Sequence, residues 1–194
     1  MPIDSVLAEA RQKEQAGDLQ GALEALDVAP EKERTGAWHY ARGAMSVRQG
    51  NLDQGVAELE QAVQREPEIA EYRSNLGAAL LEKVKAGDTS LCKRALEQLE
   101  LAVQWGATLP EVYSNLSFAR LASGDALGAL AAADVGIRLV EKHAPSLFNR
   151  AAALNALKQY GTCLDTLDEL LEVAPGFPPA VQSRASVKQK LSKM

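Results

Sequence analysis

The sequence predicts an all-α protein built from repeated antiparallel helix hairpins, and three observations support this. Apolar residues recur at the 3.6-residue period of a helix on both sides of a repeated turn. Prolines end successive stretches at Pro30, Pro67 and Pro175, because proline lacks an N–H and clashes with the preceding helical turn. The turns recur 33, 37 and 37 residues apart, at Gly17-Asp18, Gly50-Asn51, Gly87-Asp88 and Gly124-Asp125.

Each of these glycine pairs predicts a tight connection between two helices. Glycine adopts the left-handed conformation that ends one helix, and the Asp or Asn side chain can cap the next helix. A small residue follows the turn, as at Ala22, Gly55 and Ala129. Small side chains at this position allow two antiparallel helices to approach closely.

The segments that precede the turns share an aromatic residue, an asparagine and a Leu-Gly or Leu-Ser pair. Examples are Tyr72-Arg73-Ser74-Asn75-Leu76-Gly77 and Tyr113-Ser114-Asn115-Leu116-Ser117. Together with the turns and the closing prolines, this pattern resembles the tetratricopeptide repeat (TPR) family. We count five units and a capping helix in one domain over residues 1–194, with bounds of about 3–30, 36–67, 70–107, 109–140, 145–175 and 180–192. The fifth unit has Lys158-Gln159-Tyr160 in place of Gly-Asp, but its later residues stay in phase.

The resemblance implies an α-solenoid in which the hairpins form a right-handed superhelix and the first helices line a concave groove. We expect the aromatic residues that open these helices, such as Trp38 and Tyr40, to pack against the preceding unit. The third unit has three extra residues on each side of its turn, which predicts about one extra helical turn on each arm. In the last segment, Val181, Val187 and Leu191 predict the narrow apolar stripe of a capping helix.

Composition excludes several classes of function. The 194 residues are 46% hydrophobic, carry a net charge of −5 and have a pI of about 5.2. This charge disfavours nucleic-acid binding, which needs clustered Lys and Arg. No apolar run is long enough to insert into a membrane, and no export signal opens the chain, so we expect a cytoplasmic protein with Cys92 and Cys163 as free thiols.

The predicted binding residues lie on the first helices. Asn75, Asn115 and Asn149 occupy the sixth position of units three to five, where the resemblance implies a row of amides that holds the backbone of a bound peptide. In the alternative interpretation, each Asn ties its helix to the next layer through a backbone carbonyl. The other groove candidates by family position are Ser74, Ala78, Leu81, Ser114, Phe118, Leu121, Phe148, Ala152 and Asn155.

We expect neither enzyme activity nor a cofactor or metal. His39 and His143 are about a hundred residues apart, without a ligand cluster or nucleophile beside either. The clamp with which some TPR proteins grip acidic chaperone tails needs Lys or Arg at the second position, where this chain has Glu71, Glu111 and Pro145. A neutral or mildly basic partner segment therefore fits better.

These observations favour a non-enzymatic adaptor that binds a segment of a partner protein in its groove. Two alternatives remain open: a structural assembly subunit or self-associating scaffold, and a regulatory lobe for an enzyme acting in trans. After Glu172 the chain has four basic residues and no acidic one, so residues before this point carry a net −9. The first alternative would use the third hairpin, an exposed tryptophan and the basic terminal helix, through Lys83, Lys85, Lys93, Arg94, Trp105, Lys188 and Lys190.

Overall fold

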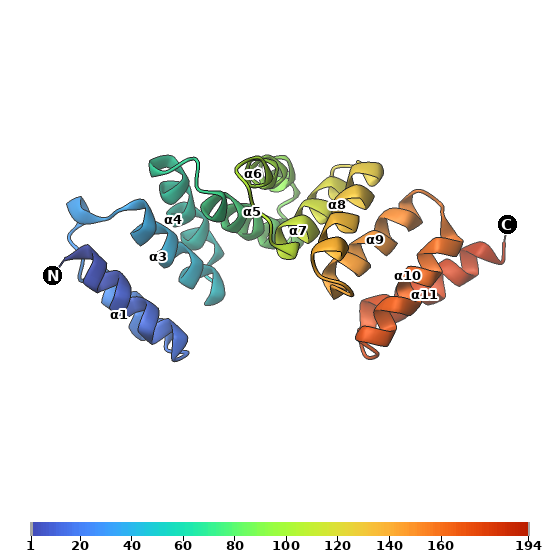
Figure 1. Cartoon of the computed structure of the whole chain (residues 1–194), viewed down its shortest axis with the longest axis horizontal. Helices are drawn as coiled ribbons and strands as arrows, with labels where there is room; N and C mark the ends of the chain where they lie inside the picture. The colour runs from blue at the N-terminus through green and yellow to red at the C-terminus, as the bar shows by residue number, and fades with distance from the viewer. Residues whose placement is uncertain (1, 194) are drawn as a thin grey trace. The chain divides into compact units, whose positions relative to one another are not determined.

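The structure, a computed structural model, describes residues 2–193, and the regular secondary structure in this range is entirely helical (Figure 1). The described part of the chain contains eleven α-helices and two short 3₁₀ helices. The α-helices are α1 Ile3–Gln15, α2 Leu19–Asp27, α3 Gly36–Arg48, α4 Leu52–Arg65, α5 Ala70–Lys85, α6 Cys92–Gln104, α7 Pro110–Ala122, α8 Ala126–Leu139, α9 Ala144–Ala156, α10 Tyr160–Val173 and α11 Pro178–Leu191. The 3₁₀ helices are η1 Glu31–Glu33 and η2 Thr89–Leu91. Among residues 2–193, no helix has the length and apolar character needed to cross a bilayer.

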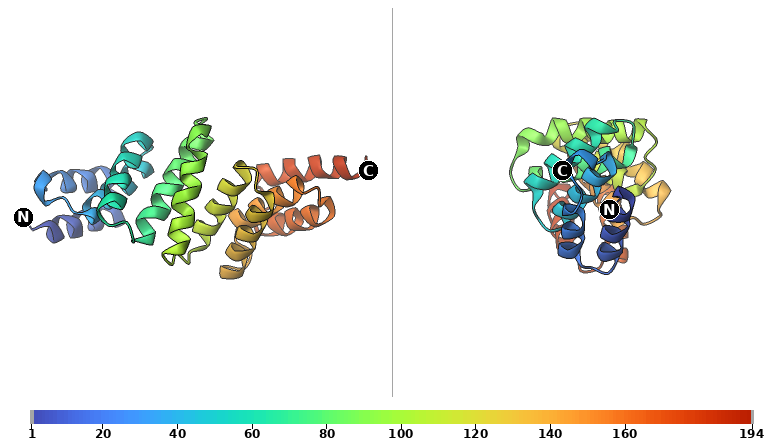
Figure 2. Two further views of the ribbon diagram at one scale, coloured as in Figure 1. Left: turned by 90° about the horizontal axis from the view of Figure 1, so that it is seen from above. Right: turned by 90° about the vertical axis from the view of Figure 1, so that its left-hand side faces the viewer.

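The helices form two compact units, Met1–Gly106 and Ala107–Met194. Unit 1 contains the hairpins α1–α2, α3–α4 and α5–α6, and unit 2 contains α7–α8, α9–α10 and the final helix α11. Within each unit, the two helices of a hairpin pack against each other and successive hairpins lie side by side (Figure 2). The predicted all-α architecture of antiparallel hairpins is confirmed, and the single domain stays a prediction.

The turns between paired helices share one backbone geometry. Gly17, Gly50, Gly87 and Gly124 have φ between +83° and +115°, and Lys158 has φ +61° at the fifth turn. The residue after each of them donates its N–H to a carbonyl five residues earlier, as Gln159 does to Leu154 at 2.9 Å. Lys158 thus occupies the left-handed position that glycine fills elsewhere.

The predicted side-chain caps form at two of the four Gly-Asp or Gly-Asn turns. Asp18 Oδ1 accepts the N–H of Gly21, and Asp125 Oδ1 accepts that of Gly128, each at 2.8 Å. The prediction is wrong for Asn51 and for Asp88, whose side chains make no cap hydrogen bond. Asp88 Oδ1 instead accepts the Ser90 hydroxyl at 2.5 Å.

Glycines bring paired helices into close contact, as predicted for the small residues after the turns. A Cβ atom at Gly43 in α3 would lie 2.8 Å from Leu59 Cγ and 3.0 Å from the carbonyl oxygen of Gly55 in α4. A Cβ at Gly55 would lie 2.4 Å from Val47 Cγ2. The α3–α4 contact therefore depends on glycine in both helices.

The third hairpin is extended differently on its two arms. Helix α5 has 16 residues, whereas the first helices of the other four hairpins have 13, so the extra turn predicted for this arm is confirmed. On the second arm the prediction is wrong, because the extra residues form η2 and α6 has 13 residues. The N–H of Leu91 bonds to the carbonyl of Asp88, three residues back, which is the 3₁₀ pattern.

The terminal helix packs on a different face from the one predicted. Ala180 and Val187, seven residues apart, are buried against the core of unit 2, which includes Leu167 and Leu170. Val181 is 51% exposed and Leu191 is 46% exposed, so the predicted stripe of Val181, Val187 and Leu191 is wrong. Val181 lies about 100° around the helix from Ala180, which turns it away from α10.

Candidate functional site

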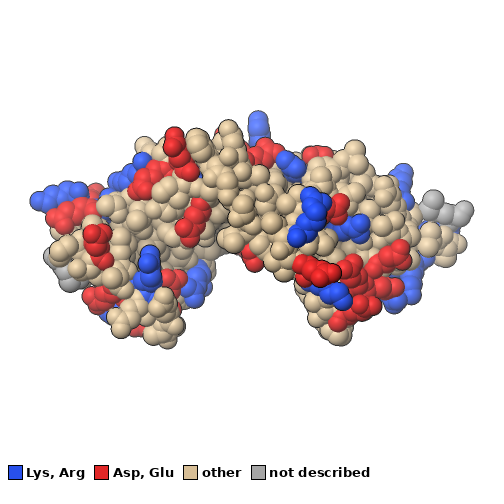
Figure 3. All heavy atoms as spheres, in the orientation of Figure 1, with Lys and Arg blue, Asp and Glu red and all other residues tan. Residues whose placement is uncertain are grey.

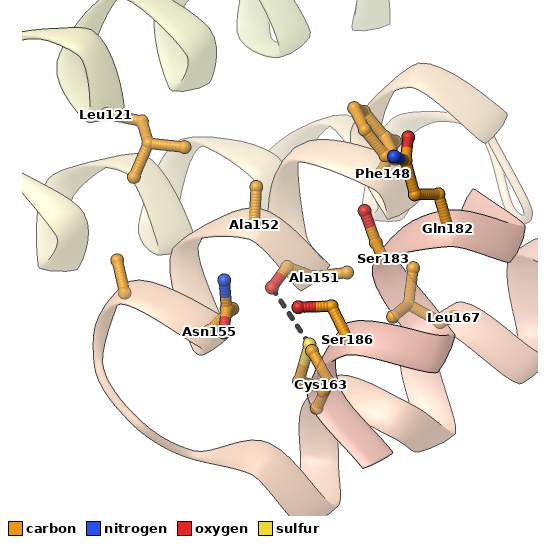
Figure 4. Close-up of a pocket in the computed structure, with 12 residues that line it drawn as sticks. Leu121, Phe148, Ala151, Ala152, Asn155, Cys163, Leu167, Gln182, Ser183 and Ser186 are labelled. Carbon is orange, nitrogen blue, oxygen red and sulfur yellow. Dashed lines mark hydrogen bonds between the residues drawn. The ribbon is translucent and has the colours of Figure 1, made fainter. Parts of the chain in front are cut away.

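Unit 2 contains an open pocket of about 550 Å³, lined by side chains from α7, α9, α10 and α11 (Figure 4). We call it the unit-2 pocket. Leu121, Phe148, Ala152 and Asn155, all predicted groove residues, line it. None of its twelve lining residues is charged. The pocket therefore offers apolar contact and neutral hydrogen-bonding groups to a ligand.

Helix α9 supplies one wall of the unit-2 pocket because of its helical periodicity. Phe148, Ala152 and Asn155 are spaced four and three residues apart, which places them on one side of the helix. Leu147 and Leu154 are fully buried in the core on another side, and this fixes the rotation of α9. The Phe148 ring packs edge-on against Phe177, with ring centroids 5.3 Å apart.

The floor of the unit-2 pocket is neutral. Leu167 is fully buried, and Cys163 is 1% exposed and donates its Sγ–H to the carbonyl of Ala151 at 3.1 Å, as the dashed line in Figure 4 shows. Burial raises the pKa of the Cys163 thiol, so it stays protonated near neutral pH. Both cysteines are free thiols, as predicted.

Helix α11 forms the wall that the sequence analysis missed. Gln182, Ser183 and Ser186 line the pocket, and their side chains make no hydrogen bond to other described residues. The sequence contained a signal for this wall, because Gln182, Ser183 and Ser186 are spaced so that they lie on one side of a helix. Interpretation of α11 as only a capping helix left that signal unused. These groups leave donors and acceptors for a bound chain.

A second pocket, of about 230 Å³, lies between α1, α3 and α5 of unit 1, and we call it the unit-1 pocket. The rings of Tyr40 and Tyr72 stack there, with centroids 4.8 Å apart and an interplanar angle of 20°. The Tyr40 hydroxyl donates to Glu71 Oε1 at 2.7 Å. Burial and this carboxylate raise the pKa of Tyr40. Tyr40 therefore lies at a pocket, whereas Trp38 packs on the preceding hairpin as predicted, donating Nε1–H to Leu26 O at 2.9 Å.

The three predicted asparagines have three different environments. Asn75 Nδ2 donates to the Glu71 carbonyl at 2.9 Å and to the Tyr40 hydroxyl at 3.5 Å. Asn149 Nδ2 donates to the carbonyl of Ser114 in the preceding first helix at 2.7 Å, which matches the alternative interpretation. The Asn115 side chain has no hydrogen bond to a described residue. Asn75 lies in unit 1 and the other two lie in unit 2, so a continuous row stays a prediction.

Several other predicted groove residues are already engaged. The hydroxyl of Ser74 donates to the Glu71 carbonyl at 2.9 Å, and that of Ser114 donates to the Glu111 carbonyl at 3.0 Å. Ser114 is 5% exposed and Leu81 is fully buried, so neither presents a surface to a ligand. Phe118 and Ala78 are partly buried.

Ion pairs neutralise most of the basic tip of the third hairpin. Lys83 pairs with Asp53 at 2.5 Å, Lys85 with Glu82 at 2.8 Å and Arg94 with Glu60 at 2.5 Å, while Lys93 is exposed. On the face shown in Figure 3, basic and acidic side chains are interspersed. The surface positions predicted from sequence thus do not add up to a strongly basic patch at this tip.

The remaining predicted contact residues line neither pocket, although Lys190 contacts Asn155 of the unit-2 pocket. Trp105 follows α6 and is 44% exposed. On α11, Lys188 is exposed and Lys190 donates to Asn155 Oδ1 at 3.0 Å.

The two histidines contact nearby polar side chains. His39 Nδ1 lies 2.7 Å from Glu58, and His143 Nδ1 lies 2.8 Å from the Ser146 hydroxyl. Within residues 2–193, no group of three or more His, Cys, Asp or Glu residues is arranged to hold a metal ion.

The architecture matches that of solved TPR structures. YrrB, a TPR protein with an unusual peptide-binding site, superposes with a TM-score of 0.77 at 19% identity over 93% of this chain and 90% of its own. The chain has the tetratricopeptide repeat fold. A TPR protein from Parabacteroides merdae superposes with a TM-score of 0.75 at 18% identity, over 98% of this chain and 73% of its own.

A further match is the Cut9–Hcn1 assembly of the APC/C. The TM-score is 0.77 at 17% identity, over 92% of this chain and 34% of the matched chain. Neither protein-family models nor curated proteins matched the sequence. At these identities the TPR likeness establishes the fold.

Proposed function

We propose that this protein is a non-enzymatic interaction module that holds a segment of a partner protein in the unit-2 pocket. The observation that carries the proposal is an open, uncharged pocket at the positions of Leu121, Phe148 and Asn155, which family position assigns to the ligand-facing side. The peptide-binding site of YrrB, on a similar fold, supports the same class of function.

The pocket chemistry favours an apolar anchor residue in the bound segment. A basic side chain would lose hydration among Phe148, Ala152 and Leu167 without gaining a counter-ion, and Lys190, which donates to Asn155, adds a cation beside this lining. Burying one Leu or Phe side chain contributes about 1.5–3 kcal/mol, and each hydrogen bond to Asn155 or the α11 hydroxyls adds about 0.5–1.5 kcal/mol. One anchor and a few such bonds give weak to moderate affinity, typical of a reversible module.

Selection of random displayed peptides tests this proposal directly. Peptides selected on the wild-type protein are expected to share an apolar residue and to bind Ala152→Arg at least tenfold more weakly, since the arginine fills the pocket with a charge. Ala131→Arg is the matched control, because Ala131 is an exposed alanine of α8 in the same unit. Equal loss in both variants, or no loss in Ala152→Arg, would overturn the proposal.

One observation favours a second candidate function, that of an assembly subunit. Trp105 is 44% exposed, and a large exposed aromatic residue is a common anchor of protein interfaces. If this candidate is correct, Trp105→Ala weakens capture of the native partner and Ala152→Arg does not. Capture experiments with both variants separate the two candidates.

A further inference from the structure

We propose that the unit-1 pocket binds the cationic side chain of an arginine or lysine in a partner segment. This deepens the proposed function and rests on it only for the partner being a protein. The site is a different one, in a different unit, and its ligand chemistry is opposite to that of the unit-2 pocket.

The aromatic part of the site is formed by the stacked rings of Tyr40 and Tyr72. Tyr40 is half-buried, and Tyr72 is 6% exposed. Packing of the two rings against each other holds their orientation. The face of a tyrosine ring, but not its edge, attracts a cation through the ring quadrupole, and arginine is the more frequent partner of such rings.

The charged part of the site is the Glu71 carboxylate, which is held in place before any ligand arrives. Its Oε1 accepts the Tyr40 hydroxyl at 2.7 Å, and that hydroxyl accepts Asn75 Nδ2 at 3.5 Å. Because Tyr40 has a single proton to donate, this arrangement requires Glu71 as an acceptor. Glu71 forms no ion pair with any described residue, so its carboxylate is available to pair with a cationic ligand.

The other lining residues suit a long basic side chain. Glu14 adds a second carboxylate, although its Oε1 already pairs with Arg48 at 2.5 Å. Ala41 and Ala44, which are partly buried, offer an apolar surface for the methylene stem. The lining contains two carboxylates and one cation, Arg11, and because Arg48 neutralises Glu14, Glu71 is the carboxylate that remains to attract a cation.

The positive charge of Arg11 lets the proposal predict whether a substitution strengthens or weakens cation binding. Arg11 lines the same pocket, and its positive charge repels an incoming cation. Removal of this charge by Arg11→Gln should therefore tighten cation binding, by about twofold at a partly exposed site. A pocket that bound neutral or acidic groups would respond in the opposite way or not at all.

Amide chemical shifts of the ¹⁵N-labelled full chain test the site with a defined probe, Nα-acetyl-L-arginine amide. We expect saturable shifts of amides in α3 and α5, and none with the isosteric neutral citrulline derivative. Glu71→Gln should weaken binding at least fivefold, while Glu68→Gln, an equal charge change at an exposed position of unit 1, should not.

The proposal is overturned if the arginine probe gives no saturable shift, or if the citrulline probe shifts the same amides equally. The wild-type comparison of the two probes decides the matter even if Glu71→Gln disturbs folding. Ala152→Arg leaves this site intact, so arginine binding by that variant distinguishes failure here from failure of the proposed peptide site.

Discussion

The two pockets show how one repeat architecture yields opposite chemistries. In each unit an asparagine at the sixth position contacts the residue 35 positions earlier, which is the fifth position of the preceding first helix. Asn75 reaches the side-chain hydroxyl of Tyr40, and Asn149 reaches the backbone carbonyl of Ser114. The unit-1 pocket gains an oriented carboxylate through this contact, and the unit-2 pocket stays uncharged.

The difference originates in the fifth-position side chain. The tyrosine of α3 extends far enough to contact both Asn75 and Glu71. Its hydroxyl accepts the Asn75 amide and donates to Glu71, and these two bonds orient the carboxylate. The serine of α7 bonds to its own helix at Glu111, which leaves its carbonyl as the partner of Asn149. The asparagine thus has a structural role in unit 2 and an orienting role in unit 1.

The largest expected effect is a loss of stability in Trp38→Ala. Trp38 is 1% exposed and its Nε1–H bonds to the Leu26 carbonyl, so it fixes α3 on the first hairpin. Truncation of a buried aromatic residue of this size lowers the free energy of unfolding by about 3–5 kcal/mol. Urea denaturation followed by far-UV circular dichroism measures this loss, and a change below about 1 kcal/mol would contradict the assigned packing.

A smaller effect on the free energy of unfolding distinguishes Asn149 from Asn115, the two asparagines of unit 2. Asn149→Ala removes the 2.7 Å bond to Ser114 and should lower the free energy of unfolding by about 0.5–1.5 kcal/mol. Asn115→Ala is the matched control and should stay within about 0.5 kcal/mol of wild type. Equal destabilisation of the two variants in urea would refute a structural role specific to Asn149.

The turns offer a stabilising change. All three hairpins of unit 1 turn at glycine, whereas the second hairpin of unit 2 turns at Lys158 with φ +61°. Lys158→Gly relieves the side-chain clash of this conformation and should raise the free energy of unfolding by about 0.5 kcal/mol, after the entropy cost of glycine. An increase in the thermal midpoint checks this, and a clear decrease would show that the lysine is not strained.

A further effect concerns alkaline pH. The raised pKa of Tyr40 means that the folded protein keeps the hydroxyl proton where the unfolded chain loses it. This contribution to stability is complete below the unfolded pKa of about 10, and decreases as pH rises toward the folded-state pKa. Between pH 9 and pH 11 the urea midpoint of wild type should therefore fall more steeply than that of Tyr40→Phe, and parallel curves would rule out the coupling.

The sequence determined the hairpins because turn, helix period and closing proline all repeat. Even the fifth turn was located without glycine, since Cys163 and Leu167 stayed in phase. The faces of α11 were harder to predict, because Val181 and Val187 are both apolar and only contact with α10 decides which is buried.

Only part of the site could be predicted from the sequence, because the rest depends on contacts between helices. Family position identified Leu121, Phe148 and Asn155, which line the unit-2 pocket. It gave no indication that Tyr40 would bond to Glu71, a residue 31 positions away, because such a contact depends on the distance between neighbouring first helices. Side-chain partners across hairpins are set by packing, which a single sequence does not specify.

The central claim is that the unit-2 pocket holds the native partner. The most direct measurement is affinity capture from native lysate, with mass spectrometry, using wild type, Ala152→Arg and the control Ala131→Arg at matched folded concentrations. We expect one protein to be captured by wild type and Ala131→Arg and lost from Ala152→Arg. Retention of every captured protein by Ala152→Arg would contradict the claim and place the interface outside this pocket.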